Sequence, residues 1–188
     1  NICKYIDIPL QHINSRILKS MRRGMDGDST RRLVESIRHN IPGVAIRTTF
    51  MVGYPGETDR EFGELVRFAE EMKFERLGVF TYSQEEDTPA FSLGDPVPRK
   101  IKQQRADHLM SVQEGISLEL NRAKIGKVMK VLVDEKDDSY YIARTEHDSP
   151  EVDNEVLIPA SGNDLVPGNF YEVKITRADS FDLYAEFR

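Results

Sequence analysis

The chain has 188 residues, of which 39% are hydrophobic and 31% charged, a composition that excludes disordered, fibrous and collagen-like proteins. No apolar run approaches the roughly 18 residues of a membrane-spanning helix, and no secretory signal opens the chain. The single cysteine, Cys3, cannot form an internal disulfide, nor can it alone hold a structural zinc or an iron–sulfur cluster. We therefore expect a soluble protein of the reducing cytoplasm, with no membrane partner.

The net charge of −6 is unevenly placed along the chain. Residues 1–123 hold 18 basic and 18 acidic side chains, whereas residues 124–188 hold 8 basic and 14 acidic ones. Because nucleic-acid affinity comes mainly from Lys and Arg, the acidic segment favours a basic protein partner over RNA. A solvated acidic face that only maintains solubility is the alternative.

The first 95 residues alternate between strand and helix patterns. The expected strands are 5–10, 44–52 and 77–82, and apolar spacing predicts helices at 13–21, 28–41 and 58–72. Gly24 is expected to end the first helix in a left-handed conformation. Asp28 or Ser29 is expected to cap the N-terminus of the second helix, and Thr58 with Glu61 is expected to form a capping box on the third. This order predicts βα units with a parallel sheet, either open and doubly wound or an arc of a barrel.

The pattern changes after the Gly94–Pro98 break. Residues 99–122 are charged and helical, with Ile101, Leu109, Val112, Ile116 and Leu120 on the expected apolar stripe of a connecting helix. Five short segments of period two follow, at 127–134, 140–145, 155–159, 170–176 and 181–187, and they predict a small closed OB-like barrel. We expect three parts, covering residues 1–95, 96–123 and 124–188.

Three motifs lie at the ends of the three expected strands in the first part. They are PLQH at 9–12, RTTFMVGYPGET at 47–58 and FTYSQEEDTPA at 80–90. Backbone N–H groups in a glycine-rich turn before a helix can bind carboxylate or ribose oxygens. Alone, such a turn is more often only a βα connection, but the three motifs together are specific.

With these motifs the chain resembles the radical S-adenosylmethionine methylthiotransferases, and its last 65 residues resemble their TRAM domain. The resemblance implies α/β plus all-β architecture, namely the C-terminal half of a partial (βα) barrel followed by a five-stranded OB-like barrel. It also implies a transferase that uses S-adenosylmethionine and two four-iron four-sulfur clusters. The chain opens at Asn1 and lacks both cysteine triplets of the family. We therefore expect a fragment without the N-terminal domain, which alone is inactive and binds no cluster.

The resemblance and the strand ends together suggest binding residues, and they suggest no catalytic residue or metal ligand. The expected contacts to S-adenosylmethionine are Gln11, Arg47, Thr49, Gly53, Pro55 and Glu57. Arg47 is the best carboxylate partner among them. For any one of these residues, a structural salt bridge or turn bond is an equal alternative. The expected substrate contacts are Tyr82, Ser83, Glu85, Glu86, Glu151 and Asp153. His12 is interpreted first as a structural histidine and second as a polar lid over the cofactor.

Two subclasses of this family compete, one that modifies adenosine in tRNA and one that modifies an aspartate of small-subunit ribosomal protein S-twelve. The acidic pair Glu85–Glu86 and the PEVD turn at 150–153 resemble the ribosomal subclass, and an acidic barrel suits a basic ribosomal protein. We therefore expect methylthiolation of an aspartate β-carbon, with S-twelve bound through the TRAM domain. A tRNA adenosine methylthiotransferase and a module that only binds the ribosomal protein are the alternatives.

Overall fold

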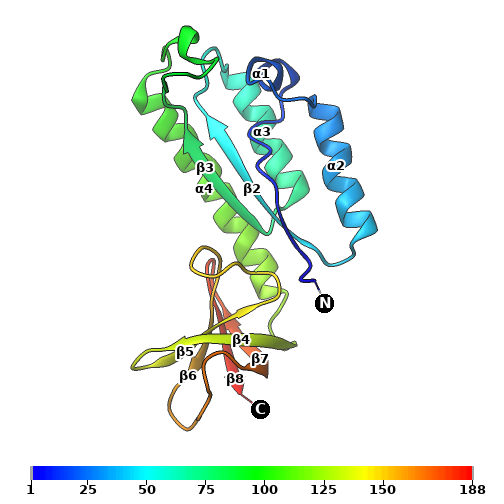
Figure 1. The fold of residues 1–188 in the computed structure, drawn as a ribbon, viewed down its shortest axis with the longest axis vertical. Helices are drawn as coiled ribbons and strands as arrows, with labels where there is room; N and C mark the ends of the chain where they lie inside the picture. The colour runs from blue at the N-terminus through cyan, green and yellow to red at the C-terminus, as the bar shows by residue number, and fades with distance from the viewer. Residues whose placement is uncertain (1, 188) are drawn as a thin grey trace. The chain divides into compact units, whose positions relative to one another are not determined.

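A computed structural model describes residues 2–187 as two compact units (Figure 1). The first unit comprises residues 6–113. The barrel unit comprises residues 114–187, together with residues 2–5. The chain therefore passes from one unit to the other within its longest helix, and the three-part division expected from the sequence stays a prediction.

Among the described residues, no helix combines the length and the apolar character that a membrane crossing requires.

The first unit has a three-stranded sheet in the order β1-β2-β3, with β2 and β3 parallel. Its helices pack against this sheet (Figure 1). The strands are β1 (Tyr5–Asp7), β2 (Ala45–Val52) and β3 (Arg76–Thr81). The helices are α1 (Ser15–Ser20), α2 (Gly27–Asn40), α3 (Asp59–Met72), the short 3-10 helix η1 (Phe91–Leu93) and α4 (Arg99–Arg122). The predicted βα units and the helix over 99–122 are confirmed.

Side chains along β2 alternate between buried and half-buried, and this alternation distinguishes the two faces of the sheet. Phe50 is fully buried on the helix side, where its ring lies 6.1 Å from Phe68 and 5.8 Å from Phe74. Such tilted and edge-on ring pairs add to the area they bury. Thr49 and Met51 alternate with Phe50 and are only half-buried, because they lie on the opposite face. We call this the open face of the sheet.

The helix ends agree only partly with the sequence patterns. The capping box of Thr58 and Glu61 is confirmed on α3. The cap of α2 is Asp26, whose carboxylate accepts the Ser29 N–H at 2.8 Å, so the prediction of Asp28 or Ser29 was wrong by two or three positions. The left-handed residue after α1 is Arg22, with φ of 56°, and not Gly24.

The barrel unit contains five strands that form a closed barrel, as the sequence predicted, and their order is β4-β5-β6-β8-β7. They are β4 (Val128–Lys136), β5 (Tyr140–Thr145), β6 (Val156–Pro159), β7 (Phe170–Ala178) and β8 (Leu183–Phe187). All neighbouring strands are antiparallel except β6 and β8, which are parallel. Inward-facing side chains such as Val133, Ile158 and Ile175 are fully buried in a separate apolar core. The barrel thus has a hydrophobic core of its own.

Candidate functional site

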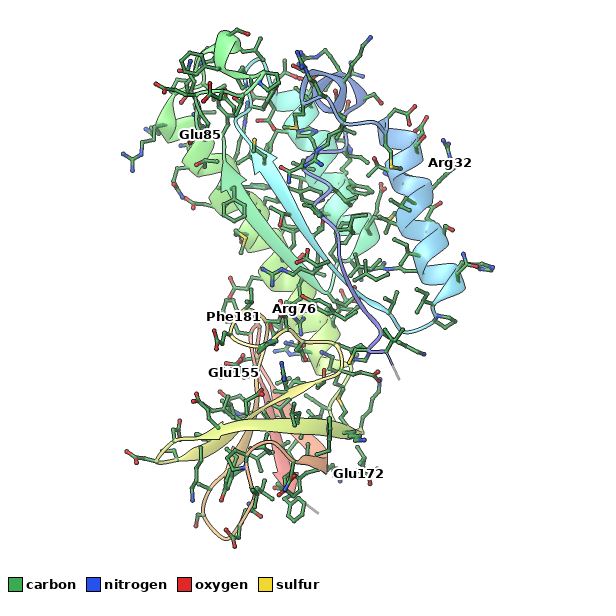
Figure 2. All side chains as sticks on the ribbon, in the orientation of Figure 1. Arg32, Arg76, Glu85, Glu155, Glu172 and Phe181 are labelled. Carbon is green, nitrogen blue, oxygen red and sulfur yellow. The ribbon has the colours of Figure 1, made fainter. Side chains whose placement is uncertain are left out.

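A pocket of about 370 Å³ opens where the strands of the first unit end. The end of β2 contributes Met51, and Tyr82 and Ser83 follow β3 directly. Figure 2 shows Glu85, which also lines the pocket, beyond the end of β3. The lining residues are Gln11, Ser20, Met21, Arg22, Arg23, Met51, Tyr54, Tyr82, Ser83, Glu85, Thr88, Pro89 and Ala90. Ligands of parallel α/β sheets bind at this edge, so the pocket is the candidate site of the unit.

Gln11 reaches the pocket through a strained backbone. Its φ is 71°, a left-handed value that residues with a side chain seldom adopt. The Gln11 N–H donates to the Thr49 carbonyl at 2.8 Å, and the Gln11 carbonyl accepts the Met51 N–H at 2.8 Å. These two bonds hold the residue in place after β1. Strain of this kind persists where the surroundings determine it, and it is typical of functional sites.

Beside the pocket, Glu57 forms a buried ionic cluster. Its side chain is fully buried, and one carboxylate oxygen accepts from Arg105 at 2.7 Å and from the Gly53 N–H at 2.5 Å. Arg105 also donates to Asp59 at 2.7 Å. The second Glu57 oxygen lies 3.1 Å from Nε2 of His12. Glu57 therefore joins the segment after β1, the turn after β2 and the helix α4, and Arg105 extends the cluster to the start of α3.

His12 is a structural histidine in this cluster. The ring is fully buried, and its Nδ1 accepts the Asn14 N–H at 3.0 Å. Because Nδ1 accepts a hydrogen bond, the ring proton lies on Nε2 and points to Glu57. This geometry agrees with the structural interpretation of His12.

Lys102, one turn before Arg105 on α4, fixes the other side of the turn. Its Nζ donates to the Tyr82 carbonyl at 2.7 Å, pairs with Asp95 and lies 5.3 Å from the centre of the Tyr82 ring. A Cβ added at Gly53 would lie 2.4 Å from the Lys102 side chain. Gly53 also has φ of 72°, so this position requires glycine for two independent reasons.

The sequence missed Lys102 and Arg105 because both are charged residues on a helix expected to bury apolar ones. The predicted stripe included Ile101, which is exposed, whereas Lys102 and Arg105 take the buried positions beside Leu109. Lys102 precedes Arg105 by three residues and Arg105 precedes Leu109 by four, and this helical spacing was the available signal. A cation at such a position indicates a buried anion opposite, which here is Glu57.

The structure separates the expected cofactor residues into three places. Gln11 lines the pocket, and Thr49 lies on the open face of β2 with Arg47, whose guanidinium is 3.7 Å from Asp7. Gly53, Pro55 and Glu57 are buried in and around the turn. The Glu57 carboxylate is held by protein partners on both oxygens. The geometry therefore gives Glu57 a role in shaping the turn.

Among the expected substrate residues, Tyr82, Ser83 and Glu85 line the pocket, whereas Glu86 is exposed outside its lining. Tyr82 is buried, with its ring 5.4 Å from Tyr54 and its hydroxyl donating to the Ala90 carbonyl at 3.2 Å. Burial is the main cause that raises the pKa of the Tyr82 phenol, and Tyr54, Asp95 and Glu85 add to it. Tyr82 is therefore a neutral wall of the pocket at physiological pH.

The barrel carries a group of neighbouring carboxylates. The pKa of Glu155 is raised, first because partial burial removes water and then because Asp182, Glu135, Asp134 and Asp137 carry like charge nearby. The backbone of Glu155 is bonded to Asp182 and Leu183, which ties this group to the start of β8. We call these five residues the acidic cluster of the barrel. Figure 2 shows Glu155 near Phe181, with Glu172 at another part of the barrel.

The two barrel residues expected to bind substrate differ in their surroundings. Glu151 is exposed, with a left-handed φ of 63°. Asp153 is half-buried and accepts the Ser149 N–H at 2.8 Å, which closes the turn between them. Neither residue belongs to the acidic cluster.

The described residues offer no ligand set for an iron–sulfur cluster. No group of three or more His, Cys, Asp or Glu side chains between residues 2 and 187 could hold a metal ion, and Cys3 is exposed. The residues of this chain therefore do not fit such a cluster. The pocket and the open face fit S-adenosylmethionine better, because the amide side chain of Gln11 lines the pocket together with aromatic and thioether side chains.

Comparisons with known proteins agree with this division. A family model described as "Radical SAM superfamily" matches residues 1–69, and one described as "TRAM domain" matches residues 125–187. The chain thus combines a radical SAM segment with a TRAM barrel. A solved structure of coproporphyrinogen III oxidase (HemN) from Escherichia coli matches 63% of this chain and 28% of its own, with a TM-score of 0.49 and 14% identity. That likeness is too distant to carry further inference.

Several relatives share the printed name "Ribosomal protein uS12 methylthiotransferase RimO". Those of Christiangramia forsetii and Cytophaga hutchinsonii are each 54% identical, over 98% and 99% of this chain. That of Bacteroides thetaiotaomicron is 52% identical over 99%. The matches cover 41%, 43% and 43% of the three relatives, so the chain spans about two fifths of their length. Along nearly its whole length the chain is therefore similar to radical S-adenosylmethionine methylthiotransferases.

The first prediction concerns the buried ionic cluster. Replacing Arg105 with Ala leaves the Glu57 carboxylate buried without its cation, and we expect a loss of about 3–5 kcal/mol in the free energy of unfolding of the first unit. Urea denaturation measures this change. Arg99→Ala, which removes an exposed arginine from the same helix, is the matched control and should change stability by less than about 0.5 kcal/mol. Equal effects of the two substitutions would contradict the analysis.

A second cluster joins α1 to α3 and gives a pH dependence. Arg16 donates two bonds of 2.7 Å to the Glu61 carboxylate and one of 2.7 Å to the Gly56 carbonyl. Arg16 is the main cause that lowers the pKa of Glu61 from 4.5 to about 2, and bonds from Thr58 add to it. Because the folded pKa lies below the unfolded value, Glu61 stabilises the fold above about pH 4.5.

We therefore expect this stabilisation to fall as the pH drops from about 4.5 to about 2. Glu61→Gln should be less stable at neutral pH and should lose less stability over that interval than the unsubstituted protein. Thermal unfolding at a series of pH values measures the difference. Glu35→Gln, at an exposed position on α2, is the control and should keep the original acid dependence. An unchanged acid dependence in Glu61→Gln would refute the assignment.

Proposed function

We propose that this chain takes part in the methylthiolation of an aspartate β-carbon in ribosomal protein uS12. The observation that carries the proposal is the 52–54% identity, along nearly the whole chain, to relatives named for uS12 methylthiotransferase activity. The pocket at the carboxyl edge of the sheet supports it, because that edge is where such a reaction needs its substrate. A ribosomal substrate implies a cytoplasmic enzyme.

For the cofactor, we propose that S-adenosylmethionine lies along the open face and the pocket. When bound, it supplies the methyl group and the radical that takes hydrogen from an unactivated carbon. Gln11 would donate its amide to the cofactor, and Arg47 and Thr49 would bind it along β2. The Glu57 cluster holds the turn of Gly53 and Pro55 in shape beside them. Two four-iron four-sulfur clusters remain part of the proposal for the whole enzyme.

For the substrate, we propose that the target residue enters the pocket between Tyr82, Ser83 and Glu85. The loop that carries them is folded on itself, because Thr88 donates to the Glu85 carbonyl at 2.7 Å and Gln84 donates to the Phe91 carbonyl at 2.7 Å. Tyr54 and Tyr82 give the pocket an aromatic floor. Apolar side chains beside the reacting carbon suit a radical reaction, since they offer few groups for side reactions.

The whole enzyme, with its clusters reconstituted under anaerobic conditions, tests this proposal. It is incubated with S-adenosylmethionine, a sulfur source and either uS12 or tRNA, and the products are analysed by mass spectrometry. We expect one methylthio group on an aspartate of uS12 and none on tRNA. Modified adenosine in tRNA without modified uS12 would favour the tRNA subclass. Binding of uS12 by an enzyme that modifies neither would favour a module that only binds.

We further propose that the TRAM barrel binds uS12 through its acidic surface. The segment from residue 124 has 14 acidic and 8 basic residues, and the pKa of Glu155 is raised first by burial and then by repulsion from the other carboxylates of the acidic cluster. A basic partner would relieve that repulsion, whereas RNA phosphates would add to it. Glu151, exposed on its turn, would extend the same surface.

Salt and charge reversal test the barrel. We expect uS12 to bind more tightly than tRNA, and its association rate to fall as salt increases. Replacing Glu135 and Glu155 with Lys should slow association about tenfold or more at low salt, measured by surface plasmon resonance. Replacing Glu172 with Lys is the control, because it reverses one charge outside the acidic cluster. It should slow association less, for each charge reversed, than the substitutions at Glu135 and Glu155. Salt-sensitive binding of tRNA alone would contradict the proposal.

A further inference from the structure

The end of α1 places an arginine where a helix usually has glycine. The Arg22 N–H donates to the Lys19 carbonyl at 3.0 Å, and the Arg23 N–H donates to the Leu18 carbonyl at 2.9 Å. These two bonds form a Schellman motif, in which the left-handed residue is Arg22, with φ of 56°. Glycine adopts this conformation without strain, and arginine does not. The usual preference for glycine therefore does not explain the residue at this position.

Both arginines line the pocket, and both are exposed. Neither guanidinium forms a hydrogen bond or an ion pair with any residue in the described range 2–187. By contrast, Arg16 on the same helix is bonded to Glu61 and to the Gly56 carbonyl. The pocket lining thus contains two guanidinium groups that can donate hydrogen bonds to a ligand. It contains one carboxylate, that of Glu85.

The segment that carries these arginines is anchored to the pocket floor. The Tyr54 hydroxyl donates to the Ser20 carbonyl at 3.1 Å and lies 3.2 Å from the Ser20 hydroxyl. Tyr54 is itself buried against Ile17 and Tyr82. The end of α1 is therefore fixed relative to the aromatic floor, only two residues before Arg22. A side chain carried by a fixed backbone loses less freedom on binding a ligand than one carried by a mobile segment.

We propose that Arg22 and Arg23 form a carboxylate-binding subsite that recognises the side chain of the target aspartate. The inference rests on the proposed function and deepens it. A guanidinium binds a carboxylate through two parallel hydrogen bonds, which fixes the orientation of the carboxylate as well as its position. An aspartate held in this way presents its β-carbon at a defined place in the pocket, which Met51 and Tyr82 also line. The same subsite rejects asparagine, because an amide offers one acceptor oxygen and no charge.

S-adenosylmethionine also carries a carboxylate, so the test must separate the two sources. The whole enzyme is titrated with a synthetic peptide of the uS12 target loop that contains Asp, and with a matched peptide that contains Asn. Fluorescence anisotropy gives the two dissociation constants, and equilibrium dialysis gives that of S-adenosylmethionine. The variants are Arg22→Gly, Arg23→Gln and the double substitution. Arg32→Gln is the control, since Arg32 is exposed on α2 outside the pocket (Figure 2).

We expect the unsubstituted enzyme to prefer the Asp peptide by about 10-fold or more, and the double variant to lose most of that preference. Arg22→Gly should keep or raise the melting temperature, because glycine relieves the left-handed strain, so weaker binding cannot be ascribed to misfolding. Arg32→Gln should keep the preference, and all variants should bind S-adenosylmethionine with unchanged affinity.

Three results would overturn the inference. The first is an unsubstituted enzyme that binds the Asp and Asn peptides equally, and the second is a double variant that still prefers the Asp peptide. The third is a variant that binds S-adenosylmethionine more weakly but keeps its preference for the Asp peptide. Modification of uS12 by the unsubstituted enzyme is measured in parallel. If uS12 is not modified but the preference is present and depends on Arg22 and Arg23, the subsite stands and the proposed reaction fails. The two failures are therefore distinguishable.

Discussion

The first unit depends on one buried carboxylate, that of Glu57. Taking an anion out of water costs several kcal/mol, and the protein offsets this with a guanidinium, an imidazole N–H and a backbone N–H within hydrogen-bonding distance. Each partner comes from a different segment, so the charge can be satisfied only when those segments assemble. This requirement fixes the conformation of the segments at the strand ends, which the apolar core alone would not fix. The pocket lies directly beside this charge and takes its geometry from it.

Much of the architecture could be predicted from the sequence because it follows from local rules. The period of two after Gly126 predicted the strands of the barrel, and Thr58 with Glu61 predicted the start of α3. These signals lie within a few residues of one another, where spacing determines which groups meet. Closure into a barrel also followed, since five short strands with little else to cover them favour a barrel.

The candidate site was less predictable because its contacts join residues far apart in the sequence. Glu57 and Arg105 are 48 positions apart, and nothing in either motif identifies the other as its partner. The left-handed end of α1 was assigned to Gly24 because glycine is the usual residue there, but the hydrogen bonds select Arg22. Both misses have the same cause. A residue with an unfavourable local preference was placed by tertiary contacts, and the sequence alone does not show those contacts.

The closed barrel has a consequence for how this family can diversify. Because β4 pairs with both β5 and β7, and β8 completes the circle, no strand among the described residues of the barrel presents an open edge. An open sheet must guard its edges against pairing with other chains, often by placing charges there, which limits what the surface can become. A closed barrel is free of that demand. Its outer residues can change sign over evolutionary time without loss of the inner core, so one scaffold can exchange a nucleic-acid partner for a protein partner by surface substitutions alone.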